Sequence, residues 1–134
     1  MRIKNLSIIS VGGNKEACTV EISESPPWVL VFNSEAFGTI QCGGVDLFEC
    51  LISLRRILEK RGFNILCQGA RSNVISSRMT KQMSGGRLAY LTQMGEPAKE
   101  ANLVDIFEPA LETDIGSIEE QKTYQQSWLD MFSK

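Results

Sequence analysis

One strongly amphipathic stretch, from Asp46 to Arg61, constrains the fold of this chain more than any other feature. Its leucines recur every three or four residues, a spacing that places them on one face of a helix. Asp46 and Glu49 have the spacing of an N-terminal capping box, and Gly62 can adopt the left-handed conformation that ends a helix. The stretch therefore predicts one principal helix that buries its apolar face against a second layer of structure.

The sequence on either side of this helix has the features of β-strands, with apolar runs separated by turn-forming residues such as Gly12-Gly13 and Pro26-Pro27. Before the helix, strands are predicted at residues 2–11, 18–22, 28–32 and 38–42. After it, strands are predicted at residues 63–67, 88–94 and 103–107. The run at 28–32 is apolar at every position, which is typical of a central strand covered on both faces.

The chain is expected to close with a second helix, because Ser117 and Glu120 repeat the capping-box spacing. The apolar side of this helix is predicted to consist of Ile118, Tyr124, Trp128 and Met131. With 134 residues, 43% of them hydrophobic, the chain can bury one core and is too short for two ordinary domains. We therefore predict a single α+β domain over residues 1–134, mainly antiparallel sheet, with one principal helix packed on it and a C-terminal helix.

The segment from Gln68 to Gly86 is predicted to be a long functional loop, because polar connections of this length are uncommon in a small domain. Within it, Ser76 is predicted to cap a short helix over residues 77–83. The candidate anion-binding residues of this loop are Arg71, Ser76, Ser77, Arg78 and Lys81. The alternative is that Arg71 pairs with an internal carboxylate such as Asp105, while the serines satisfy the loop backbone.

Charge is divided unevenly along the sequence. Residues 55–87 contain eight basic residues and one acid, whereas residues 96–120 contain eight acids and one lysine. Either the two regions neutralise each other across the folded surface, or one of them faces a charged partner. The candidate partner-binding acids are Glu96, Glu100, Glu108, Glu112 and Asp114. The basic residues that end the principal helix either complement its dipole or form a phosphate-binding patch: Arg55, Arg56, Lys60 and Arg61.

The sequence offers little for catalysis or metal binding. It contains no histidine, so an activated serine or cysteine nucleophile would lack its usual base. Four irregularly spaced cysteines are interpreted as reduced thiols of the core, with a four-cysteine zinc site or disulfides as the alternative: Cys18, Cys42, Cys50 and Cys67. We predict a protein that is not an enzyme, with no catalytic residues, no cofactor and no metal site.

The amino-terminal residues do not have the pattern of a signal peptide. The stretch MRIKNLSIIS mixes charges and serines into its apolar residues, and no later apolar run approaches the length needed to span a membrane. A cytoplasmic protein with no membrane partner is therefore expected.

Five segments carry a resemblance to a known group of proteins: GGVDLFECLISLRRILEKRG, CQGAR, SNVISSRM, MSGGRLAYLTQMG and LVDIF. Over about residues 28–132, the chain resembles small bacterial immunity proteins of polymorphic toxin systems, including those of contact-dependent growth inhibition. The resemblance implies an antitoxin that binds and neutralises a cognate toxin domain by direct protein–protein contact. Many toxin domains carry basic clefts, so the acidic residues of 96–120 are the expected contact surface, and nucleic acid is not expected as a partner.

The alternative function is that of an anion-binding module for a nucleotide, a phosphosugar or RNA, which would use the loop at 68–86. This loop departs from the resembled family between Val74 and Met79, where the family has Tyr-Pro before a Ser-Gly-Met portion. No ligand shared with the family through this loop therefore follows from the resemblance.

Overall fold

The first half of the chain forms a curled antiparallel sheet. The structure, a computed structural model, describes residues 1–132. The strands of this sheet are β1 (Arg2–Ser10), β2 (Lys15–Ile22), β3 (Trp28–Ser34), β4 (Gly38–Gly44) and β5 (Phe63–Ile65). Their order is β4-β3-β2-β1-β5, and each strand is antiparallel to its neighbours. All five strands predicted for this part of the chain are confirmed, although β5 is shorter than expected.

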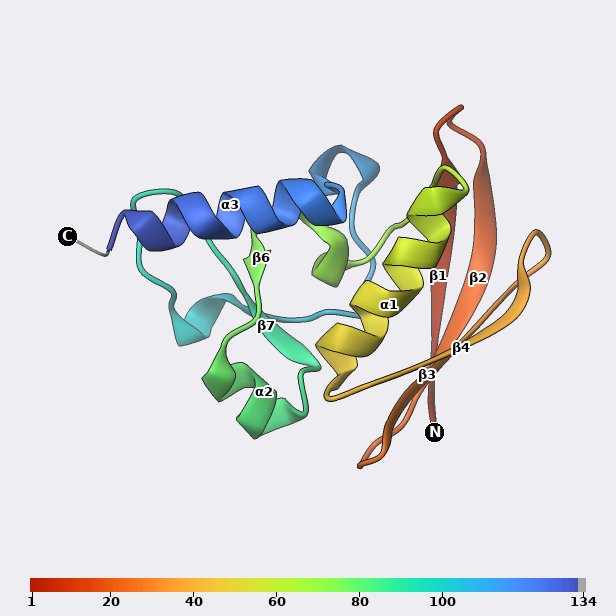
Figure 1. The fold of residues 1–134 in the computed structure, drawn as a ribbon, viewed down its shortest axis with the longest axis horizontal. Coiled ribbons are helices and arrows are strands. Elements are labelled where there is room, and N and C mark those ends of the chain that lie inside the picture. Colours follow the sequence, from red (N-terminus) through yellow and green to blue (C-terminus); the bar gives the residue numbers. More distant parts are fainter. Residues whose placement is uncertain (133–134) are drawn as a thin grey trace.

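Helix α1 (Leu47–Lys60) packs across one face of this sheet (Figure 1). Asp46 caps it, because its Oδ1 atom accepts a hydrogen bond of 2.8 Å from the backbone N–H of Glu49. Gly62, with φ +77°, follows the last turn in the left-handed conformation. Fully buried side chains fill the space between helix and sheet: Ile8, Val20, Ile22, Leu30, Phe32, Leu47, Leu51, Leu54, Leu58 and Ile65. The predicted principal helix and its buried face are confirmed.

Strand β3 differs from its prediction in how much of it is covered. Leu30 and Phe32 are fully buried, whereas Val29 and Val31, which point to the opposite face, are partly exposed. The reason is that α1 and the second half of the molecule lie on the same side of the sheet, and none of the helices in residues 1–132 covers the other side (Figure 1). The continuous apolar run was therefore a misleading signal for burial on both faces.

The second half of the chain forms a smaller sheet and the remaining helices. Its strands are β6 (Val74–Ile75), β7 (Leu88–Leu91) and β8 (Leu103–Asp105), antiparallel in the order β6-β7-β8. Its helices are α2 (Arg78–Ser84), α3 (Ile118–Asp130) and three short 3₁₀ turns, η1 (Gln68–Ala70), η2 (Glu100–Asn102) and η3 (Glu112–Asp114). With the first sheet, these elements complete the single α+β domain predicted from the sequence.

The segment from Gln68 to Gly86 is more ordered than the predicted long loop, because it contains η1, β6 and α2. The cap of α2 is Ser77 and not Ser76. The Oγ atom of Ser77 accepts from the backbone N–H of Thr80 at 3.2 Å, and the Thr80 hydroxyl accepts from the N–H of Ser77 at 2.8 Å. Buried residues in this segment tie it to the core, so much of its sequence has a structural role.

Helix α3 begins at the predicted capping box. Ser117 Oγ accepts from the N–H of Glu120 at 3.0 Å, and Glu120 Oε1 accepts from the N–H of Ser117 at 2.8 Å. Of the predicted apolar side, Ile118 is buried and Trp128 donates through Nε1 to the Glu96 carbonyl at 2.9 Å. Met131 lies beyond the last turn and is 45% exposed, so its prediction as a packed residue was wrong.

A buried charge, Arg55, joins α1 to the second half of the molecule. The side chain is 2% exposed, and its guanidinium donates to Gln121 Oε1 at 2.6 Å and to the Gly116 carbonyl at 3.0 Å. One turn later on α1, Glu59 lies 4.0 Å from the same guanidinium and accepts from the N–H of Ile118 at 2.9 Å. Burial lowers the pKa of Arg55 from its ordinary value, so these oxygens are needed to stabilise the charged form.

Gln121, on α3, completes this network. Its amide nitrogen donates to the backbone carbonyls of Gly69, Arg71 and Val74 at 2.9 to 3.0 Å. Arg55 was predicted either to complement the helix dipole or to join a phosphate-binding patch. Both interpretations are wrong for this residue, because its charge is turned inward and satisfied by the network.

Replacing Gln121 by leucine is expected to lower the free energy of unfolding by about 3 kcal/mol, because it removes the amide that donates to three backbone carbonyls and the side-chain oxygen that accepts from the buried Arg55 guanidinium at 2.6 Å. Urea unfolding followed by circular dichroism measures the change. The matched control is Gln125→Leu, one turn along the same helix at a half-buried position, which should stay within about 0.5 kcal/mol of the original protein. Equal losses in the two variants would contradict the role given to Gln121.

Candidate functional site

A hollow of about 530 Å³, lined by a chemically varied set of side chains, lies between α2, the start of α1 and Trp28. Its lining includes four of the five residues predicted to bind an anion: Ser76, Ser77, Arg78 and Lys81. Trp28 and Val45 form apolar parts of the wall, and the cap residue Asp46 contributes a carboxylate. The structure thus brings most of the predicted anion-binding residues to one place.

Two glycines allow the hollow to form where it does. Gly85 ends α2 with φ +65°, and a Cβ atom there would lie 2.4 Å from the ring of Trp28. Gly86, with φ +85°, would place a Cβ atom 2.9 Å from Asp46 Oδ1. The Gly85 carbonyl accepts a hydrogen bond of 2.8 Å from the N–H of Leu47. The glycine pair is required for close packing of α2 against Trp28 of the sheet and against the start of α1.

The basic residues of the hollow are unequally engaged. Lys81 Nζ lies 3.7 Å from Asp46 Oδ2, which offsets part of its charge. Arg78 is exposed, and within residues 1–132 it forms no ion pair. The Oγ atom of Ser76 is buried and has no hydrogen-bond partner among the described residues. Arg78 therefore has the guanidinium most available to an external anion, and Ser76 has an unused hydroxyl.

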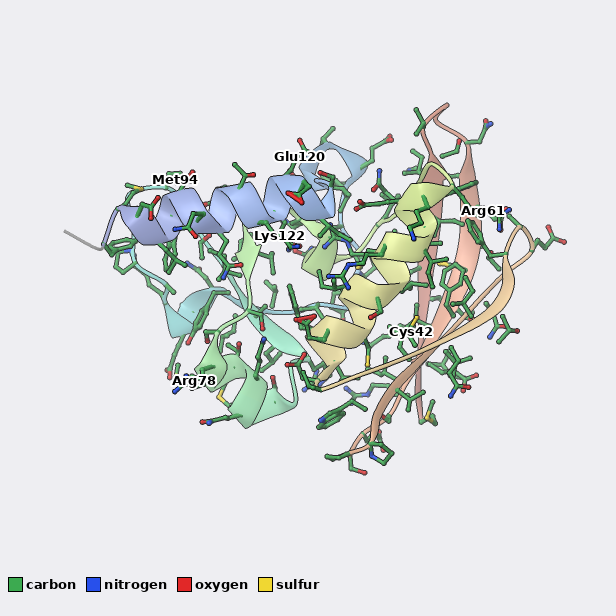
Figure 2. The ribbon with its side chains drawn as sticks, in the orientation of Figure 1. Cys42, Arg61, Arg78, Met94, Glu120 and Lys122 are labelled. Atoms are coloured by element: carbon green, nitrogen blue, oxygen red, sulfur yellow. The ribbon has the colours of Figure 1, made fainter. Side chains whose placement is uncertain are left out.

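A second hollow, of about 220 Å³, adjoins the first, because Ser76 and Lys81 line both. It adds Arg56 from α1 and Lys122 from α3, with Glu49 as the acid of its lining. Figure 2 shows Arg78 and Lys122 on these two different helices, α2 and α3. The four basic side chains around the paired hollows outnumber the two acids, Asp46 and Glu49, which gives the lining a net positive charge. Lys122 was not among the residues singled out from the sequence.

Arg71, the fifth predicted anion-binding residue, lies elsewhere. Its guanidinium donates to Asn73 Oδ1 at 3.4 Å and to Gln68 Oε1 at 3.3 Å, and it lies 3.9 Å from Asp114 Oδ2. The alternative that Arg71 pairs internally is confirmed, but its carboxylate is Asp114. The expected partner, Asp105, instead accepts from Arg87 at 2.6 Å.

Two other predicted basic residues are also accounted for by local contacts. Arg61 lies over the ring of Phe37, with the guanidinium carbon 4.2 Å from the ring centre, a cation–π contact. Lys60 is exposed in the last turn of α1, where a positive charge complements the helix dipole. Of the four basic residues at this end of α1, only Arg56 lines a hollow.

The five predicted partner-binding acids do not form one cluster. Glu108, Glu112 and Asp114 lie in the connection that precedes α3, whereas Glu96 lies beside the C-terminal half of α3, where its carbonyl accepts from Trp128. Glu100 follows in the same loop as Glu96, at the start of η2. Because α3 has 13 residues, these two regions lie at opposite ends of a helix about 20 Å long.

Residues 108–120 form an acidic connection between β8 and α3. Its five acids are Glu108, Glu112, Asp114, Glu119 and Glu120, and it contains no basic residue. Glu119 and Glu120 belong to the first turn of α3, and Figure 2 shows Glu120 there. Together with Ser72, Thr123 and Tyr124, they line a hollow of about 440 Å³. Glu120 was predicted as part of the capping box of this helix, and neither glutamate was among the predicted partner-binding acids.

Contacts with the rest of the molecule fix this acidic connection in place. Lys4 Nζ lies 2.8 Å from Glu108 Oε1, and Arg71 lies close to Asp114. Between these two acids, Leu111 is 71% exposed. The connection therefore presents an exposed apolar side chain that has acids on both sides of it in the sequence, two of which are engaged by basic residues.

The four cysteines are buried and form no disulfide, as predicted for core thiols. Burial raises the pKa of Cys18 to about 12 and, with nearby acidic groups, that of Cys50 to about 11. Burial also raises the pKa of Cys67 to about 11 and that of Cys42 above its ordinary value. Thiols with raised pKa values are poor nucleophiles at neutral pH. Among residues 1–132, no group of three or more potential metal ligands gathers at one point.

Comparisons with family models and with curated proteins found no relative of this chain. No family model matches the chain, and no curated protein matches it at a significant level. None of the helices in residues 1–132 has the length and hydropathy needed to cross a membrane. The basis for a functional proposal is therefore the geometry of the hollows beside α2 and of the acidic connection at 108–120.

The raised thiol pKa values predict slow modification of the native protein. At pH 8, a shift from 9.0 to about 11 lowers the thiolate fraction of Cys50 or Cys67 by about a hundredfold, before access to the reagent is considered. Reaction with a chromogenic disulfide reagent should be at least that much slower in the native protein than in concentrated guanidinium chloride. Rapid reaction of all four native thiols would show that the core opens readily.

Proposed function

We propose that this protein is a cytoplasmic bacterial immunity protein, which binds and neutralises the toxin domain of a polymorphic toxin system by direct contact. The observation that supports this proposal best is the acidic connection at 108–120. Its exposed Leu111, with acids on both sides of it in the sequence, offers the residue types of a protein interface, an apolar anchor and a polar rim. A toxin domain with a basic cleft is the complementary partner.

This mode of action requires no chemistry from the immunity protein. A binding surface that covers the toxin's cleft excludes the toxin's substrate, and opposite charges on the two proteins accelerate their association. The acidic connection suits this role because its charges lie on one continuous segment whose position is fixed by Lys4 and Arg71. Glu96 and Glu100 have no part in the proposed interface, since they lie at the other end of α3.

Reversing three charges of the acidic connection tests the proposal. The variant Glu108→Lys, Glu112→Lys, Asp114→Lys should bind the cognate toxin domain about thirtyfold more weakly, a loss of roughly 2 kcal/mol. Isothermal titration calorimetry measures the affinity, and survival of cells that express the toxin domain measures protection.

The control is a second triple variant with the same change in net charge, Glu24→Lys, Glu96→Lys, Glu100→Lys, all at exposed positions. It should bind the toxin domain with nearly the original affinity, because its changed net charge should alter only the association rate, and only slightly. Circular dichroism and thermal unfolding verify that both variants fold, because the first set also removes the contacts with Lys4 and Arg71. Equal affinities for the original protein and both variants would reject the acidic connection as the interface.

A second candidate function is favoured by the paired hollows beside α2. Arg78 and Lys81, with Arg56 and Lys122 nearby, could bind the phosphate of a nucleotide, a phosphosugar or RNA, while Trp28 offers an aromatic wall to a base. Asp46 weakens this proposal, because its carboxylate lies 3.7 Å from the Lys81 ammonium group and would compete with the ligand's phosphate for that positive charge. We therefore place it second.

A thermal-shift screen with nucleotides, phosphosugars and RNA tests this second candidate. A true ligand at ten times its dissociation constant should raise the melting temperature by about 5 °C, and added salt should reduce the effect. The variant Arg78→Ala, Lys81→Ala should lose the shift, whereas Arg2→Ala, Lys15→Ala, which removes two charges from the first sheet, should retain it. No shift with any compound would reject anion binding and leave the immunity proposal standing.

A further inference from the structure

Strand β4 leaves one whole edge of the five-stranded sheet unpaired. β3 is its neighbour on one side, and no strand within residues 1–132 pairs with the other side. The pairing with β3 runs without interruption over seven residues, so no bulge turns this edge away from an approaching strand. The opposite edge of the sheet, β5, has only three residues. The fold therefore offers one long, regular edge.

This edge lacks the features by which proteins usually prevent strand addition. Charged side chains, prolines and bulges protect most exposed edges. β4 has the sequence GTIQCGG, which contains no charge and no proline, and most of its residues are exposed. Three of its seven residues are glycines, Gly38, Gly43 and Gly44, and the lack of side chains there favours close approach of a second backbone.

The residues on either side of Gln41 in β4 are alike in character, since apolar Ile40 and Cys42 flank it and a glycine ends the strand on each side. If two copies pair antiparallel with the symmetry axis at Gln41, Gly38 faces Gly44 of the second copy and Ile40 faces Cys42 of the second copy. Ile40 and Cys42 lie on the side of the sheet that α1 covers, because they pair with the buried residues Phe32 and Leu30. Apolar side chains would thus meet on the covered face, and small or uncharged ones on the open face. Figure 2 shows Cys42 on β4, on the part of the sheet that this pairing would extend.

From these observations we propose that β4 is a homodimer interface, through which two copies of this protein join their sheets edge to edge. Backbone hydrogen bonds between the two β4 strands create one continuous ten-stranded sheet, with both α1 helices on the same face. The interface uses none of the acidic connection and none of the hollows beside α2. It does not depend on the function proposed above.

Charge placed on the symmetry axis tests both the interface and its register. In the dimer, two Gln41 side chains lie opposite each other on the open face of the sheet. Gln41→Lys and Gln41→Glu should each weaken dimerisation roughly fivefold, because like charges then face each other. An equimolar mixture of the two variants should restore the original affinity, since a lysine then faces a glutamate. Analytical ultracentrifugation of the full chain over a range of concentrations measures the dissociation constants.

The matched control is Thr19→Lys, which places the same charge on the open face but on the central strand β2. It should leave dimerisation unchanged, and circular dichroism verifies that all variants fold. If the original protein stays monomeric at the highest concentration, the proposal is overturned. This outcome includes the case in which β4 pairs only with a strand from a different protein. A dimer that is unaffected by both charges at Gln41, or not restored by the mixture, would place the interface elsewhere.

Discussion

The arrangement of the two halves depends on one buried charge. Arg55 projects from α1 away from the first sheet and meets Gln121 of α3, and together they bind carbonyls from three separated parts of the chain. A buried guanidinium is costly unless its donors are paired, so the network is satisfied only when α1, η1 and α3 are all in place. Hydrophobic packing holds α1 on its sheet, whereas this polar network fixes where the second half docks.

The sequence was sufficient for most of the first half because its signals are local. Leucine spacing, a capping pair and a C-terminal glycine define α1, and turn residues separate the strands. Coverage of β3 could not be predicted in the same way, since a valine at position 29 or 31 suits a partly open face as well as a closed one. Which face is covered depends on where the later elements pack, and no local pattern records that.

The candidate site was only partly predictable for the same reason. Arg78, Lys81 and the two serines are close in sequence on α2 or just before it, so their grouping followed from proximity. Arg71 is equally close in sequence, but Asp114 draws it away through a contact between distant segments. Arg55 illustrates the limit most clearly. Helical spacing places Arg55 beside the apolar face, four residues after Leu51 and three before Leu58, and Arg56 on the exposed side. No local pattern indicates the distant partners, Gln121 and Gly116, that the buried charge requires.

The acidic connection combines a fastened backbone with exposed side chains. Near its start, the N–H of Ala110 donates to the Leu66 carbonyl, and near its end the N–H of Gly116 donates to the Ala70 carbonyl. These bonds involve only main-chain atoms, so they are indifferent to the residues between them. Substitutions at 111–113 can therefore accumulate without loss of the fold. If the acidic connection is the proposed interface, such substitutions would change its recognition specificity while the scaffold beneath it stays constant.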